Sequence, residues 1–236
     1  MAAIAGQTRT ARLSVTAVRD LRLIALTFSS GAVDAIAFLG LGKVFTAFQT
    51  GNFVFLGIGA ADAGGPQLPR VACSLIGFAA GVLAATLLVR PTKGSSPWPR
   101  RVTHTLSAVV AAQAAFLLVW AATSGRPGTA SGHMLAALSG LAMGLQSGAV
   151  LSLAVAGVFT TAATATLMFL VRSIAERSTA PERARFAGVL VALCAGAAAG
   201  GLLLVHARTL APALPLAVTA LVVATSVRSQ LPKSAV

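Results

Sequence analysis

Long apolar segments, separated by short polar and basic stretches, dominate this sequence. About 20 mostly apolar residues are enough to cross the hydrocarbon core of a bilayer. Segments of that length lie at residues 21–41, 70–89, 102–122, 134–155, 185–205 and 210–227. The pattern predicts six full transmembrane helices in one membrane domain.

Two shorter segments interrupt this pattern and resemble each other. Residues 44–56 read Val-Phe-Thr-Ala-Phe-Gln-Thr-Gly-Asn-Phe-Val-Phe-Leu, and residues 159–170 read Phe-Thr-Thr-Ala-Ala-Thr-Ala-Thr-Leu-Met-Phe-Leu. Without a gap, Phe45, Thr46, Thr50, Phe55 and Leu56 match Phe159, Thr160, Thr164, Phe169 and Leu170. The match predicts a duplicated protein.

The duplication extends into the flanking helices. Gly31-Ala-Val-Asp-Ala precedes the first short segment as Gly144-Leu-Gln-Ser-Gly precedes the second, which places Asp34 opposite Ser147. Arg70 and Arg185 open the helices that follow. We expect repeat one at about residues 21–122 and repeat two at about 134–227, within a membrane domain at 21–228 flanked by an N-terminal tail at 1–20 and a C-terminal tail at 229–236.

Each short segment combines a non-helical stretch with half of a membrane helix. Residues 44–49 are β-branched and aromatic and favour an extended conformation. Thr50, Gly51 and Asn52 then supply helix-start chemistry, because Thr and Asn side chains accept from free first-turn amides and Gly permits unusual dihedral angles. The helix that follows ends near residue 61.

Composition and charge favour the bilayer over nucleic acid. Apolar residues make up 56% of the chain and charged residues 10%, which is unusual for a soluble domain. The net charge is +13, but the Lys and Arg residues form short clusters between apolar segments rather than one basic face. We therefore expect lipid contact and no nucleic acid.

The basic clusters also distinguish two topologies. If both half helices cross the membrane, twelve of the eighteen Lys and Arg lie on the cytoplasmic side; if both re-enter, fourteen do. The second count follows the positive-inside rule more closely and places the N-terminus in the cytoplasm. The predicted fold class is an all-α integral membrane protein with six full spans and two broken or re-entrant half helices in an inverted repeat, while the crossing arrangement remains an alternative.

The two breaks are the candidate functional site. Non-helical backbone at membrane depth must be buried in protein or line a water-filled cavity, and the start of a helix favours an anion or a polar acceptor. We expect a solute between the two half-helix starts. The candidate residues are Asp34, Thr46, Gln49, Thr50, Gly51, Asn52, Gln146, Ser147, Thr160, Thr161, Thr164 and Thr166. The alternative is that these side chains only satisfy neighbouring backbone.

Asp34 is the most specific of these residues. A carboxylate at the centre of a membrane helix costs at least about 2.5 to 3.5 kcal/mol, so it usually faces a cavity, a partner or a proton path. No Lys or Arg lies in the core of a predicted helix to pair with it, and loss of hydration favours the neutral acid. A proton-coupled carrier and a hydrogen-bond donor to the half-helix backbone are both consistent with this.

We predict a small secondary transporter or permease for a small polar or anionic solute; the alternative is a non-transporting membrane scaffold or accessory subunit. No catalytic, metal-ligand or phosphate-binding pattern is present, so we expect no enzyme, metal or cofactor. The small-residue faces Gly77-x-x-x-Gly81 and Gly196-x-x-x-Gly200 let helices approach closely. They predict either packing within the chain or a homodimer.

Three motifs resemble the YoaK-like family of small bacterial multi-pass membrane proteins of unknown function: Gly31-Ala-Val-Asp-Ala-Ile-Ala-Phe-Leu, Thr50-Gly-Asn and Gly144-Leu-Gln-Ser-Gly-Ala-Val. The resemblance covers about residues 20–225. It departs from the family pattern at Ser147, where we would expect Asn, and at Ala165, where we would expect Gly. It implies a bacterial inner (cytoplasmic) membrane protein and brings no substrate.

Overall fold

The computed structural model describes residues 14–89 and 96–230, which are all α-helix, turn and loop, with no strand among them. The helices are α1 (Val15–Gly40), α2 (Gln49–Ala60), α3 (Leu68–Leu88), α4 (Arg100–Ala122), α5 (Thr129–Leu151), α6 (Ala163–Ala175), α7 (Ala180–His206) and α8 (Ala213–Gln230), with a 3-10 turn at Arg208–Leu210. The predicted all-α fold class is confirmed.

Six segments of the described chain are long and apolar enough to span a membrane, and α2 and α6 are not among them. With 12 and 13 residues and a rise of about 1.5 Å per residue, each of these two reaches only about two thirds of the way through a hydrocarbon core of about 30 Å. The predicted half helices are therefore present.

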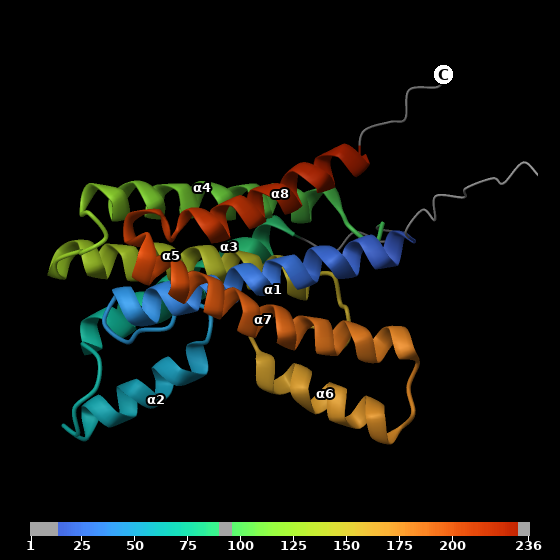
Figure 1. Ribbon diagram of the computed structural model, residues 1–236, viewed down its shortest axis with the longest axis horizontal. Helices are drawn as coiled ribbons and strands as arrows, with labels where there is room; N and C mark the ends of the chain where they lie inside the picture. Colours follow the sequence, from blue (N-terminus) through green and yellow to red (C-terminus); the bar gives the residue numbers. More distant parts are fainter. Residues whose placement is uncertain (1–13, 90–95, 231–236) are drawn as a thin grey trace, which may run out of the picture.

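The six long helices form a bundle, and α2 and α6 lie on one side of it (Figure 1). Within the bundle α1 packs against α7 and α3 packs against α5, while α4 contacts α5 and α8, and α8 also contacts α1. Each half helix packs against the long helix that follows it in sequence, α2 against α3 and α6 against α7. The closest helix pairs thus join different halves of the sequence.

Glycine makes these close pairs sterically feasible. A Cβ added to Gly77 would lie 2.2 Å from the carbonyl oxygen of Ala137 on α5, and one added to Gly196 would lie 1.9 Å from that of Phe28 on α1. Both predicted small-residue faces are therefore covered by other helices of the same chain. A homodimer through these faces would require the helix pairs to separate.

Hydrogen bonds connect neighbouring helices at each end of the bundle. At one end, Arg22 Nη2 donates to the carbonyl of Thr225 at 2.8 Å, so the beginning of α1 is attached to the end of α8. At the other, Trp120 Nε1 donates to the carbonyl of Arg208 at 2.9 Å, and Arg70 Nη1 donates to that of Leu41 at 2.8 Å. The first and last described helices thus have their terminal ends on the same side (Figure 1).

At the first break the chain turns back along the bundle. After α1 ends, the loop through residues 44–48 turns back into the bundle, and α2 runs outward again toward the end where α1 stopped (Figure 1). The segment containing α6 turns in the same way toward the opposite end (Figure 1).

Several helix boundaries differ from the predicted ones. Helix α1 begins at Val15 because Ser14 caps it, its side chain accepting from the Ala17 amide at 3.1 Å. Residues 15–20, predicted as tail, therefore belong to this helix. Similarly, α8 continues to Gln230. The remainder of both predicted tails, residues 1–13 and 231–236, lies outside the described residues.

Candidate functional site

The first break is organised around the carboxylate of Asp34. Its Oδ1 accepts from the backbone amides of Thr46 at 2.9 Å and Ala47 at 2.8 Å, and its Oδ2 accepts from that of Phe48 at 2.9 Å. Because α2 begins at Gln49, these amides directly precede a helix start, where a negative charge is stabilised. A side chain from α1 therefore occupies the place that a bound anion would take.

This geometry separates the two roles considered for Asp34. The carboxylate accepts all three hydrogen bonds, so of the two alternatives the structure does not support the one in which Asp34 donates to the half-helix backbone. In the described part of the chain Asp34 also has no ion-pair partner. Within the described residues, backbone amides are the only hydrogen-bond partners of its two oxygens.

Asn52 binds the other side of the non-helical segment. It is fully buried; its Oδ1 accepts from the Phe45 amide at 3.1 Å, and its Nδ2 donates to the Phe45 carbonyl at 2.7 Å and to Gln49 Oε1 at 2.6 Å. Ser74 on α3 donates to the same carbonyl at 2.7 Å. These side chains supply the partners that a regular helix would have provided to the backbone.

Thr46 and Gln49 complete this network. Gln49 Nε2 donates to the carbonyl of Thr46 at 2.8 Å, while Thr46 Oγ1 accepts from Ser139 on α5 at 2.9 Å. Sequence reasoning missed Ser74 and Ser139. The repeat could not reveal Ser74, because Val189 stands at the matching place in the second half.

The predicted helix-start role of Thr50, Gly51 and Asn52 is wrong. Helix α2 already begins at Gln49 and has no side-chain cap of its own, so Thr50 lies exposed in the first turn, as does Thr164 in α6. Gly51 has an ordinary helical backbone. A Cβ there would lie 2.9 Å from the ring of Phe45, so the glycine serves close aromatic packing.

The second break has a serine where the first has a carboxylate. Ser147 Oγ donates to the carbonyl of Met143 at 2.8 Å and shares a hydrogen bond of 3.0 Å with Thr161 Oγ1. Gln146 Nε2 donates to Ser30 Oγ at 2.8 Å and lies 3.5 Å from Thr160 Oγ1. The structure thus brings together four predicted residues, Gln146, Ser147, Thr160 and Thr161.

Thr166 is the second-half counterpart of Asn52. Its side chain is fully buried in the first turn of α6, and its hydroxyl has no hydrogen-bond partner in the described structure. A buried hydroxyl without a partner costs stability. The polar groups of the second break are therefore less completely satisfied than those of the first.

A cavity of about 260 Å³ opens beside the second break. Its walls come from α3, from the end of α5 and from the non-helical segment: Phe78, Val82, Ser147, Gly148, Val150, Leu151, Val158, Phe159, Thr160 and Thr161. Hydroxyl groups of the break therefore line a space large enough for a small molecule.

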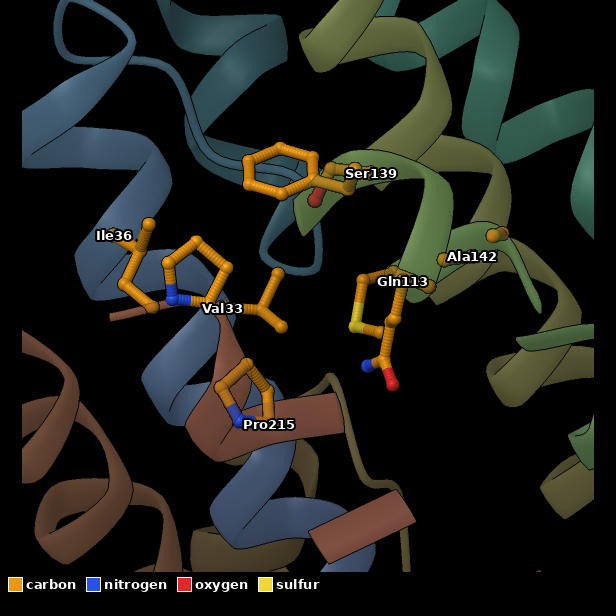
Figure 2. A pocket seen from close by; sticks show the side chains of 10 residues that line it. Val33, Ile36, Gln113, Ser139, Ala142 and Pro215 are labelled. Atoms are coloured by element: carbon orange, nitrogen blue, oxygen red, sulfur yellow. The ribbon is translucent and has the colours of Figure 1, made fainter. Parts of the chain in front are cut away.

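A second, much smaller cavity of about 20 Å³ lies between α1, α4, α5 and α8 (Figure 2). It is lined mainly by apolar side chains, together with Ser139 and Gln113. Gln113 is 6% exposed, and neither its amide oxygen nor its amide nitrogen has a partner in the described structure. The space is of the size that holds a single water molecule.

Six long apolar helices and two interrupted segments with polar linings define a multi-pass α-helical membrane protein. The chain belongs to the family described as "Protein of unknown function (DUF1275)", whose model matches residues 22–226. It is also 36% identical over 165 residues to the UPF0700 transmembrane protein YoaK of Bacillus subtilis (strain 168), an alignment that covers 70% of this chain and 71% of that protein. No solved structure matches the chain.

Proposed function

We propose that this protein is a small membrane permease for a small polar or anionic solute, and that the solute binds in the 260 Å³ cavity at the second break. One observation carries the proposal. At the first break Asp34 accepts the free backbone amides, whereas at the second Ser147 stands in its place and a cavity adjoins it.

The arrangement of the helices supports a transporter architecture. The pairs α1 with α7 and α3 with α5 exchange places if the first half of the sequence is mapped onto the second, and α2 and α6 run toward opposite ends (Figure 1). We interpret this as an inverted repeat. Transporters with such repeats bind their substrates where broken helices meet, near the middle of the bilayer.

The charge distribution supports an orientation. The end of the bundle that holds the starts of α1 and α7 also carries Arg19, Arg100 and Arg183, and basic residues favour the cytoplasmic side. The protein then lies in the bacterial inner membrane with its N-terminus in the cytoplasm. The proposal assigns it no catalytic residue and no cofactor.

Solute flux into proteoliposomes tests the proposal. The purified protein is reconstituted, and permeability to formate, acetate, chloride, nitrate and urea is compared with that of empty liposomes. We expect faster entry of at least one probe, and a loss of at least about tenfold in Ser147→Ala and Thr161→Val if each removes a hydrogen bond to a charged solute.

Thr164→Val is the matched control, because Thr164 belongs to the same segment but is exposed and should leave flux unchanged. Equal loss in this variant would contradict the site. If the folded protein admits no probe faster than empty liposomes do, the permease proposal fails. Co-purification of a stoichiometric partner would then favour the scaffold alternative.

A further inference from the structure

We infer that the ligand of the second break is a small monocarboxylate, seated as the Asp34 carboxylate is seated in the first break. The inference rests on the proposed function, since it names the chemical class of the solute for the same cavity. It comes from a comparison between the two halves of one chain.

The first half shows what its backbone binds. Three successive amides, those of Thr46, Ala47 and Phe48, converge on the two oxygens of one carboxylate at 2.8 to 2.9 Å. Oδ1 takes two of the hydrogen bonds and Oδ2 takes the third. This cradle therefore suits a ligand with two acceptor oxygens on one carbon.

By sequence alignment, the second half has counterparts of these three residues but Ser147 in place of Asp34. The counterparts of these residues are Thr160, Thr161 and Ala162. Residues 160–161 form a turn before α6, and no hydrogen bond from the Thr160 or Thr161 amide to another group is found within the described residues. The Ser147 hydroxyl bonds with the Thr161 side chain instead. The Thr160 and Thr161 amides are the ones that a carboxylate could accept from.

Another polar group of the second break lacks a partner in the described structure. The hydroxyl of Thr166, in the first turn of α6, is fully buried without a partner. Its counterpart Asn52 uses all of its polar atoms at the first break. Thr166 is not among the residues that line the cavity, so its hydroxyl shows an incompletely satisfied break rather than a contact with the ligand.

The walls of the cavity narrow the class of ligand further. They contain no Lys, Arg or His, and the side chains beside the break are mostly apolar, such as Phe78, Val82 and Val158. Burying a dianion costs more than hydrogen bonds from amides and hydroxyls alone can offset, because no positive charge lines the cavity. A ligand with one carboxylate matches the arrangement of three amides around the two oxygens of Asp34. A monocarboxylate with a short apolar tail fits both the donors and the walls.

Thermal unfolding of the purified protein in detergent tests the inference without requiring transport. Sodium formate, acetate and propionate are compared with sodium chloride at equal ionic strength. We expect one of the carboxylates to raise the melting temperature, by about 3 to 6 °C at ten times its dissociation constant, and chloride not to. Thr164→Val should keep the shift.

Ser147→Asp is the decisive variant. Its own carboxylate should occupy the second cradle as Asp34 occupies the first, so the variant should lose the shift with carboxylates. If Ser147→Asp folds and responds to carboxylates as the native protein does, the inference is wrong.

Asp34→Ala provides the reciprocal test, and it remains informative if Ser147→Asp does not fold. Removing the carboxylate opens the first cradle and should lower the melting temperature. Formate, which has the size of the lost group, should restore part of the loss, whereas chloride should not. A variant that unfolds earlier and gains no more from formate than the native protein does would contradict the comparison between the halves.

The two proposals fail in different ways. Carboxylate binding by thermal shift without flux in proteoliposomes would overturn the permease and keep the ligand class. Flux of urea or chloride, with no carboxylate shift in the native protein, would keep the permease and overturn the ligand class.

Discussion

Asp34 and Asn52 together replace the regular hydrogen bonding that the chain loses between α1 and α2. Three amides reach Asp34, and both backbone groups of Phe45 reach Asn52. Unpaired backbone groups in hydrocarbon cost several kcal/mol each. These two side chains therefore satisfy backbone groups that would otherwise be unpaired in the non-helical segment.

Gln113 is the opposite case, a buried polar side chain without hydrogen-bond partners in the described structure. We predict that Gln113→Leu raises the melting temperature, because it removes a buried amide that lacks partners and whose desolvation costs about 1 to 3 kcal/mol. Leu also fits the apolar walls of the small cavity (Figure 2). Thermal unfolding in detergent measures the shift.

Gln113→Ala is the comparison variant, because it removes the amide but enlarges the cavity and should therefore gain less than Leu or lose stability. A clear loss of stability in Gln113→Leu would mean that the amide has a partner in the working protein, such as a water molecule in the cavity.

Some of the residues at the two breaks could be identified from the sequence, whereas their contacts could not. The repeat identified the two breaks, and intramembrane polarity identified Asp34, Asn52 and Gln146. The sequence could not reveal that Asp34 accepts from the residues just before α2. That contact depends on where the returning loop lies beside α1. Thr50 and Thr164 were misassigned because the helices begin one residue before each, which turns both hydroxyls outward.

Helices α3 and α5 make several close backbone contacts at glycine positions. A Cβ on Gly144 would lie 2.1 Å from the carbonyl oxygen of Phe78. We predict that Gly144→Ala destabilises the protein by about 1 to 3 kcal/mol, because neither backbone can move away without disturbing the rest of the pair. Thermal unfolding again provides the measurement.

Gly57→Ala is the matched control for the same change of residue. Gly57 lies within α2, and no atom lies within 4 Å of a Cβ added there. Because Ala favours helix over Gly, this variant should be neutral or gain up to about 1 kcal/mol. If the two variants behaved alike, close backbone contact would not be what the glycines of α5 provide.

The element pattern was largely predictable, with one physical exception. Apolar length determined the six spans and small residues indicated the close faces, but the sequence could not tell which helices those faces meet. Helix pairing depends on how all the spans arrange together, and here Gly77 and Gly196 both face helices of the other half of the chain.

At the scale of the whole molecule, the proposed re-entrant topology predicts which loops lie on which side of the membrane. In a chain whose Cys73 and Cys194 are replaced by Ala, single cysteines are placed at Gly64, Ser124 and Ser96. Gly64 and Ser124 follow α2 and α4. We expect a membrane-impermeant thiol reagent to label these two in intact cells and to label Ser96→Cys only after the cells are opened.

The crossing alternative predicts the reverse pattern for all three positions. Labelling of Ser96→Cys in intact cells, with protection of the other two, would contradict the re-entrant arrangement. Full labelling of every variant in opened cells is the control for reagent access.

The glycine-lined pairs also limit how this protein can move. Since α1 is locked to α7 and α3 to α5, neither half of the sequence can rock as a separate body against the other, because each tight pair takes one helix from each. Helices α2 and α6 have fewer neighbours, α3 for the one and α7 for the other. Under the proposed permease function, a solute path would therefore open and close through movement of these two short helices against the six long ones.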